Sequence, residues 1–304
     1  MRALINLLFF PGGLFLIVLA LAYEWADRKL LARFENRIGP RWFQTVADIV
    51  KLLVKEEITP ATSHPILFEV LPVVAMAGAL TAGLYVPLLG MRPALSFKGD
   101  LIVTLYLLSL LTMSIGMAGW NSTSRFTMMG ATRALTQLFS YEAPFMLALL
   151  GPAIVAQSWQ ISEIAASSQG RWLLLTQPFG FVVALIGLMG KLEMPPFDAP
   201  KAKTEIVAGA LTEYSGRGLG LFHLGKEMEL VVGLTLIAAL YMGGIANPLA
   251  FFGKTLLLLV ILTSFHAVLT RLRIDQTVGL WWRYGAVVVL LQWLALIVWK
   301  GVTA

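Results

Sequence analysis

The stretch LIVTLYLLSLLTMSIGMAGW at Leu101–Trp120 holds no charged residue. About 20 apolar residues in a row are the length that an α-helix needs to cross the hydrocarbon core of a bilayer. Inside lipid every backbone polar group must find its hydrogen-bond partner within the segment, which a helix achieves. The stretch therefore predicts a transmembrane helix.

Seven similar apolar runs flank this one, so we expect an all-α integral membrane protein with about eight transmembrane helices in a single polytopic domain, residues 1–304. Between the spans we expect cytoplasmic loops at about 24–65, 121–137, 191–229 and 270–283. The predicted spans are Leu4–Tyr23, Ile66–Leu89, Leu101–Trp120, Leu138–Ala156, Leu173–Gly190, Leu230–Ile245, Thr255–Leu269 and Tyr284–Val298.

The composition agrees with a membrane protein and excludes several other classes. Apolar residues make up 58% of the chain and charged residues only 13%, whereas soluble domains carry roughly a quarter charged residues. The net charge of +6 comes from residues in short loops and not from one polar face, so we expect no nucleic acid partner. Cysteine is absent, which excludes disulfides and iron–sulfur ligation in this chain.

The distribution of Lys and Arg predicts the orientation. Seventeen of the 23 basic residues fall after the first, third, fifth and seventh spans, and six fall on the other side. Basic residues concentrate in cytoplasmic loops. We therefore expect a multi-pass protein of the cytoplasmic membrane with both termini outside.

Two of the cytoplasmic loops are longer than connectors need to be. In the first, apolar residues recur with helical spacing, and polar residues fall on the other side of the same helix. This pattern predicts an amphipathic helix that lies in the membrane interface or is covered by a partner. The apolar positions are Trp42, Val46, Ile49, Val50 and Leu53. The second long loop is helical in pattern over Thr204–Leu211.

Glu142 is the acidic residue with the most unusual surroundings. It lies between Tyr141 and Pro144 in an otherwise apolar stretch. A carboxylate at membrane depth is costly unless it is paired or protonated, so it often marks an ion path. The alternative is an interfacial carboxylate paired with Arg133 or another loop arginine.

A second group of acids, mixed with lysines, lies in the long loop. Lys201 and Glu205 are four residues apart, so on a helix they could pair. Close carboxylates raise one another's pKa and can pass a proton, and a lysine opposes that effect. The alternative is a solvated charged loop. The group contains Glu193, Asp198, Glu205 and Glu213 with Lys191, Lys201 and Lys203.

Two further patterns do not carry a function. The G-x-x-x-x-G-K spacing at residues 220–226 has Glu227 where a phosphate-binding loop needs Ser or Thr, so it indicates chance or helix packing. His223 is expected in a loop, without a metal-ligand partner. Trp281, Trp282 and Tyr284 are typical of an interfacial aromatic belt.

Three stretches, in order, resemble one family. They are DRKLLARFENRIGP with DIVKLLVKEEITP in Asp27–Pro60, GATRALTQLFSYEAP at Gly130–Pro144, and PPFDAPKAKTEIVAGALTEYSG at Pro195–Gly216. They resemble the proximal, arm-docking membrane subunit of respiratory complex I, which borders the quinone site. They also resemble its homologue in energy-converting membrane-bound NiFe hydrogenases, the formate hydrogenlyase-like subunit 4 family.

The resemblance implies a subunit that docks a soluble redox arm and couples electron transfer to H⁺ or Na⁺ translocation. It implies that Glu142, Asp198, Glu205 and Glu213 are coupling carboxylates, to which the loop charges add Glu193, Lys201 and Lys203. In the first loop it implies arm-docking residues, namely Arg33, Glu35, Arg37 and Asp48. The chain itself would bind no cofactor and no metal. Partners would carry 4Fe-4S clusters and a NiFe centre, and would include hydrogenase-type large and small subunits, an iron–sulfur subunit and antiporter-like membrane subunits.

The chain departs from the resembling family at identifiable positions. Members usually have Glu where this chain has Lys201 and Lys203, and the quinone-using branch commonly has Arg at the position of Met194. The compact loops favour the hydrogenase branch over a quinone-using or other reductase. Two other classes stay open: a stand-alone secondary transporter, which usually shows internal repeats, and a purely structural anchor whose acids only pair with Lys and Arg.

Overall fold

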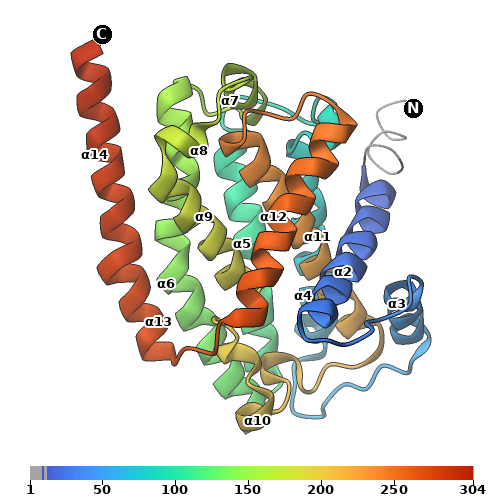
Figure 1. Cartoon of the computed structure of the whole chain (residues 1–304). Helices are drawn as coiled ribbons and strands as arrows, with labels where there is room; N and C mark the ends of the chain where they lie inside the picture. The colour runs from blue at the N-terminus through green and yellow to red at the C-terminus, as the bar shows by residue number, and fades with distance from the viewer. Residues whose placement is uncertain (1–8, 10–11, 304) are drawn as a thin grey trace.

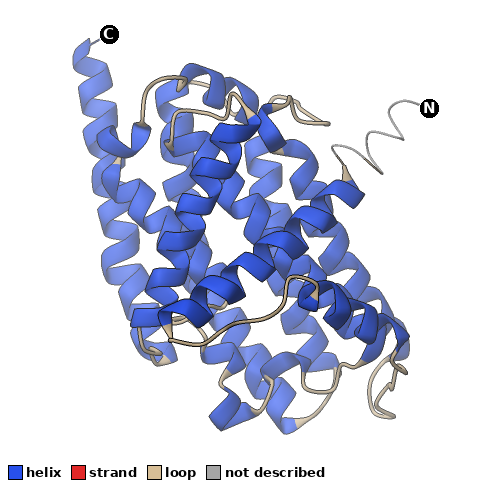
Figure 2. Cartoon of the chain, turned by 45° about the vertical axis from the view of Figure 1, so that its right-hand side comes forward, coloured by secondary structure: helices blue, strands red, loops and turns tan. Residues whose placement is uncertain are grey.

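The computed structural model describes residues 9 and 12–303, and every regular element among them is a helix (Figures 1 and 2). The long helices are α2 Gly13–Phe34, α4 Pro65–Tyr85, α5 Asp100–Asn121, α6 Arg125–Ala156, α9 Pro178–Lys191, α11 Gly216–Tyr241, α12 Pro248–Val268 and α14 Ala286–Thr303. The short elements are α3 Gln44–Val54, η1 Leu88–Gly90, α7 Ile161–Ser167, α8 Leu173–Thr176, η2 Ala199–Lys201, α10 Lys203–Ile206, η3 Gly209–Leu211, α13 Ile274–Leu280 and the π-helical η4 Trp281–Gly285.

Five helical stretches in the described part of the chain are long and apolar enough to cross a membrane. They are Pro65–Gly90, Asp100–Asn121, Arg125–Ala156, Pro248–Val268 and Ile274–Trp299. Helix α9 has 14 residues, about 21 Å at 1.5 Å per residue, against a hydrocarbon core of about 30 Å. Helices α2 and α11 carry charges within their length. Membrane integration is therefore supported, and the count of eight spans stays a prediction.

The long helices run alternately up and down in one bundle (Figure 1). Helix α2 begins and α14 ends on the same side, and α3, α10 and α13 lie on the opposite side. Helix α11 forms the centre, because every residue from Glu227 to Met242 is buried. Its close packing needs small residues: a Cβ at Gly225 would lie 2.7 Å from Leu111 Cδ1.

Several helices extend further than their apolar runs predict. Part of the first predicted span, residues 4–8, 10 and 11, lies outside the described residues, and α2 continues through the charged residues to Phe34. The loop predicted at 121–137 is wrong, because α6 begins at Arg125. Most of 270–283 is also helical, in α13 and η4. Hydropathy registers only the apolar part of a helix, whereas charged side chains at a helix end reach water or pair with one another.

Helix α11 corrects two further expectations. It begins at Gly216 and not near Leu230, so His223 is helical and does not lie in a loop. The G-x-x-x-x-G-K spacing is also part of this helix, as expected of a packing pattern.

The helix predicted over Thr204–Leu211 is broken. Helix α10 ends at Ile206, Val207 has φ 59°, and η3 begins at Gly209. A β-branched residue with positive φ cannot continue a helix. Lys201 lies before α10, so Lys201 and Glu205 do not share a helix face as predicted.

Amphipathic α3 lies at Gln44–Val54, where the first loop predicted a helix. Of its apolar residues, Ile49 is buried, whereas Val46, Val50 and Leu53 are 46%, 52% and 42% exposed. This chain leaves much of the apolar face uncovered. Whether lipid or a partner covers it remains a prediction.

The aromatic belt is correct in part. Trp282 and Tyr284 are exposed, but Trp281 is buried, with its ring centroid 5.5 Å from that of Phe197. The expectation for Trp281 is therefore wrong. A π-helical turn at 281–285 re-aims side chains relative to an α-helix, and here Trp281 points into the core.

Candidate functional site

The interior of the bundle contains a lysine between two carboxylates. Lys191, the last residue of α9, has a fully buried side chain. Its Nζ lies 3.4 Å from Glu142 Oε2 on α6 and 3.9 Å from Glu229 Oε1 on α11. The same ammonium lies 5.6 Å from the ring centroid of Tyr141 and 5.7 Å from that of Phe145, and cation–π attraction of this kind stabilises a desolvated cation.

Glu142 does not pair with Arg133, the alternative that its position left open. One carboxylate oxygen accepts a hydrogen bond from the Ser109 hydroxyl, and the other faces Lys191. Its side chain is 16% exposed. Glu142 is thus held between α5 and α9, in the interior and not in a solvated loop.

Glu229 is the most isolated charged group of the described chain. Its side chain is 0% exposed, and neither carboxylate oxygen accepts a hydrogen bond from a described residue. A buried carboxylate without hydrogen bonds is costly in its ionised form. Such a group inside a membrane protein marks an ion path by default.

A second buried cluster surrounds Glu193. Its carboxylate contacts the Lys226 ammonium and lies 3.2 Å from Lys201 Nζ. Burial opposes ionisation of Glu193, but the two ammonium groups outweigh it and lower the pKa of this carboxyl to about 2. Lys226 is on α11 three residues before Glu229, so this cluster adjoins Lys191 and its two carboxylates along one helix.

A polar cavity of about 270 Å³ borders the Glu193 cluster. A neighbouring cavity of about 330 Å³ shares Arg28, His223 and Glu227 with it. Water or hydrated ions suit such charged walls. Besides Glu193, the charged residues of the first cavity are Glu24, Asp27, Arg28, Lys201, Lys226 and Glu227.

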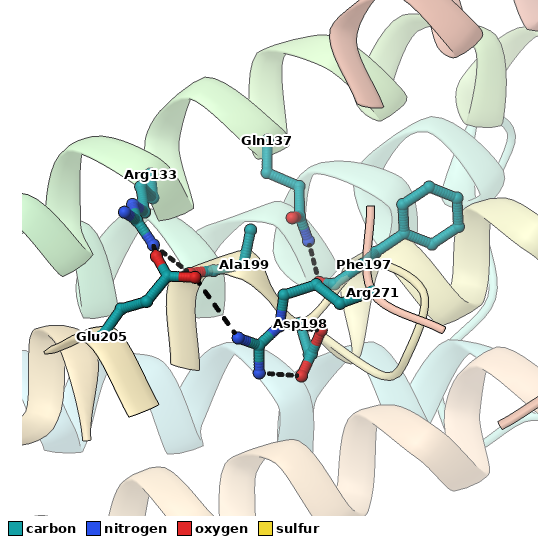
Figure 3. Close-up of polar contacts among 7 residues, drawn as sticks. All are labelled: Arg133, Gln137, Phe197, Asp198, Ala199, Glu205 and Arg271. Carbon is teal, nitrogen blue, oxygen red and sulfur yellow. Dashed lines mark hydrogen bonds and ion pairs between the residues drawn. The ribbon is translucent and has the colours of Figure 1, made fainter. Parts of the chain in front are cut away.

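Asp198 and Glu205 lie in a different, more exposed network (Figure 3). Arg271 donates from Nε and from an Nη to the two oxygens of Asp198, at 2.8 and 2.7 Å. Glu205 lies 2.6 Å from Arg133 Nη1 and 3.7 Å from Arg271 Nη1. A cavity of about 450 Å³ opens beside these residues.

The other predicted residues lie apart from both clusters. Lys203 is exposed at the start of α10, and Glu213 is half-buried between η3 and α11. In the first loop, Arg33 is exposed and Arg37 pairs with Glu35.

Asp48, the fourth predicted docking residue, accepts hydrogen bonds at 3.0 Å from both Arg28 and Gln44. It therefore turns toward the bundle and borders the 330 Å³ cavity. A docking role for these four residues stays a prediction.

Sequence reasoning missed Glu229, Lys226 and the acids of α2. Glu229 directly precedes the predicted span at Leu230, and Glu24 and Asp27 directly follow the first one. Charges that adjoin an apolar run are the signal that could have found them.

No three His, Asp or Glu residues among those described are grouped to hold a metal ion. The site therefore offers proton or cation transfer and electrostatic coupling by its side chains.

The chain is similar to membrane subunits of respiratory oxidoreductases. A family model described as NADH dehydrogenase matches residues 6–298. The H-type subunit of NADH-quinone oxidoreductase from Dehalococcoides mccartyi strain CBDB1 is 34% identical over 290 residues, covering 89% of this chain and 79% of the relative. The second H-type subunit of NADH-quinone oxidoreductase from Geobacter sulfurreducens is 34% identical over 292 residues, covering 89% of both.

A solved structure shares the fold. A chain of the membrane-bound sulfane sulfur reductase, described as an archaeal respiratory membrane complex, aligns with a TM-score of 0.85 at 24% identity, over 96% of this chain and 97% of that one.

Proposed function

The chain belongs to the NADH dehydrogenase family, and from that premise we propose that it couples electron transfer in a peripheral redox arm to H⁺ or Na⁺ translocation. Membership makes it a membrane subunit of a multi-subunit oxidoreductase complex. The observation that carries the coupling role is the buried lysine between two buried carboxylates. No solvated anchor needs such an arrangement, since desolvating these charges costs free energy that well-packed apolar residues would avoid.

The mechanism is electrostatic. Lys191 Nζ lies at similar distances from Glu142 and Glu229, 3.4 and 3.9 Å. A small movement of the ammonium toward one carboxylate favours its ionised form and leaves the other to take up a proton. A change of charge in the docked arm would reach this lysine through the Glu193 cluster, because Lys226 and Glu229 lie on the same helix.

The decisive experiment measures the number of ions moved per electron. The complex is purified through this chain, reconstituted in vesicles and compared with its Glu142→Gln and Glu229→Gln variants. We expect electron transfer to continue while the ion-to-electron ratio falls at least tenfold. Glu163→Gln is the matched control, because Glu163 is exposed on the opposite side of the bundle. Full pumping by both assembled variants would leave only the anchor function.

We also propose a hydrogenase-type arm, with 4Fe-4S clusters and a NiFe centre in the partner subunits. The sequence feature in its favour is Met194, which borders the 270 Å³ cavity where the quinone-using branch commonly has Arg. A quinone-using arm is the second candidate, because the relatives quoted above are named NADH-quinone oxidoreductase subunits. Mass spectrometry with metal analysis separates the two: co-purified nickel supports the first, and iron without nickel supports the second or another reductase.

A further inference from the structure

Segment 192–201, which follows α9, carries Glu193 into the charged interior and is held from outside at several points. On α6, Gln137 Nε2 donates to the carbonyl oxygens of Gly190 and Phe197, at 2.9 and 2.8 Å. The Phe197 ring packs on Trp281. These contacts fix the middle of the segment against the bundle.

The connection between α12 and α13 holds the same segment from the other side. The backbone N–H of Leu272 donates to the Pro196 carbonyl at 2.9 Å. Next to it, Arg271 grips both oxygens of Asp198 (Figure 3). The Lys201 N–H donates to the Asp198 carbonyl at 3.0 Å, so Asp198 also begins the turn that leads to Lys201.

This geometry suits anchoring better than ion transfer. A bidentate guanidinium–carboxylate pair fixes direction as well as distance. Guanidinium cannot give up its proton in a protein, so it holds its partner in the ionised state. Both Asp198 oxygens are occupied in this way, whereas a proton carrier needs an oxygen that can accept and release a proton.

We propose that Asp198 is a positioning residue and not an ion carrier. Its pair with Arg271 anchors segment 192–201 so that Glu193 and Lys201 meet each other and Lys226. Asp198 and Glu193 are five residues apart within this segment, so releasing Asp198 loosens the register of Glu193. The inference rests on the proposed coupling function and assigns Asp198 to a different part of it.

A charge exchange tests the inference in the intact complex. The variants are Asp198→Asn, Arg271→Gln and the double variant Asp198→Arg with Arg271→Asp, each reconstituted and measured for ions moved per electron. We expect both single variants to lower this ratio about threefold or more, and the exchange to recover at least half of the loss. A general folding defect lowers the amount of complex and its electron transfer but leaves the ratio in the assembled fraction unchanged.

An ion carrier gives the opposite pattern. Arg271→Gln would keep the carrier and pump normally, and the exchange would stay inactive because it removes the carboxylate at position 198. That pattern, or normal pumping by Asp198→Asn, overturns the inference. If single variants fail to assemble, recovery of assembly by the exchange supports the inference, and no recovery overturns it. Loss of coupling in Glu229→Gln while this test fails would leave the proposed function standing.

Discussion

The molecule has two groups of ion pairs with opposite character. The interior group joins Glu142, Lys191 and Glu229, whose side chains are 16%, 0% and 0% exposed. The peripheral group joins Asp198, Arg271, Glu205 and Arg133, whose side chains are 19% to 50% exposed. The peripheral carboxylates have good hydrogen-bond partners, whereas the interior pairs are long and Glu229 accepts no hydrogen bond from a described residue.

The difference shows where free energy is held and where it can change. Exposed ion pairs contribute little to stability, typically about 0–1 kcal/mol, so their worth here lies in the geometry that they impose. Buried charges are costly, and removing one partner strands the other. A group that can exchange protons between its members therefore belongs in the interior, and a group that fixes a loop belongs at the edge.

The largest effect is expected for Lys191→Met. Methionine fills a similar volume but leaves Glu142 and Glu229 without their cation, and breaking a buried pair typically costs about 3–5 kcal/mol. We expect the unfolding temperature of the purified complex to drop clearly and pumping to be lost. Lys203→Met is the matched control, because Lys203 is exposed. Equal stability of the two variants would show that the interior group carries no strain.

A second change disturbs the peripheral region through packing alone. A Cβ at Gly130 on α6 would lie 2.7 Å from the Cα of Gly209 in η3. Gly130→Val should push η3 and α10 from α6 at a cost of about 1–3 kcal/mol. Protease accessibility of the 202–215 segment measures the release, with Gly253→Ala as control because a Cβ there meets nothing within 4 Å. An unchanged cleavage rate would contradict the packing.

Glu193 connects the two regions, and its pH dependence is a smaller, measurable effect. Its pKa is lowered from 4.5 to about 2. A lowered folded-state pKa adds stability that is complete above the unfolded value and is lost as the pH falls through the folded value. Glu193→Gln should therefore be less stable than the native chain at neutral pH, and the difference should shrink between about pH 4.5 and about pH 2.

Differential unfolding curves of the complex over this pH range measure the change. The Asp275→Asn variant serves as control, because Asp275 is an exposed carboxylate. A stability difference that stays constant with pH would contradict the lowered pKa.

The sequence predicted the helical membrane fold because lipid leaves the backbone few alternatives, and the charge-free run at Leu101–Trp120 lies within α5. It predicted Glu142 as an interior acid for the same reason. It missed Glu229, because hydropathy began the span one residue later, at Leu230, although α11 begins at Gly216. Lys191 was recognised as a loop charge only. Its contacts depend on how α6, α9 and α11 pack, which no local pattern encodes.

The broken loop had a local signal that helical spacing concealed. Gly209 takes φ 66° and Val207 φ 59°, so the apparent period over Thr204–Leu211 is interrupted twice. The pairing of Glu205 with Arg133 and Arg271 then follows from the fold and not from the spacing to Lys201.

The smallest effect is expected for Glu205→Gln. Glu205 is half exposed, and its loss leaves the bidentate Asp198–Arg271 pair in place. We expect a stability change below about 1 kcal/mol and an ion-to-electron ratio within about twofold of the native value, whereas Asp198→Asn lowers that ratio further. Measuring both variants at low and high salt sharpens the comparison, because salt screens an exposed pair and leaves buried charges nearly untouched. A loss of pumping in Glu205→Gln as large as in Glu229→Gln would return Glu205 to the ion path and remove the division between edge and interior.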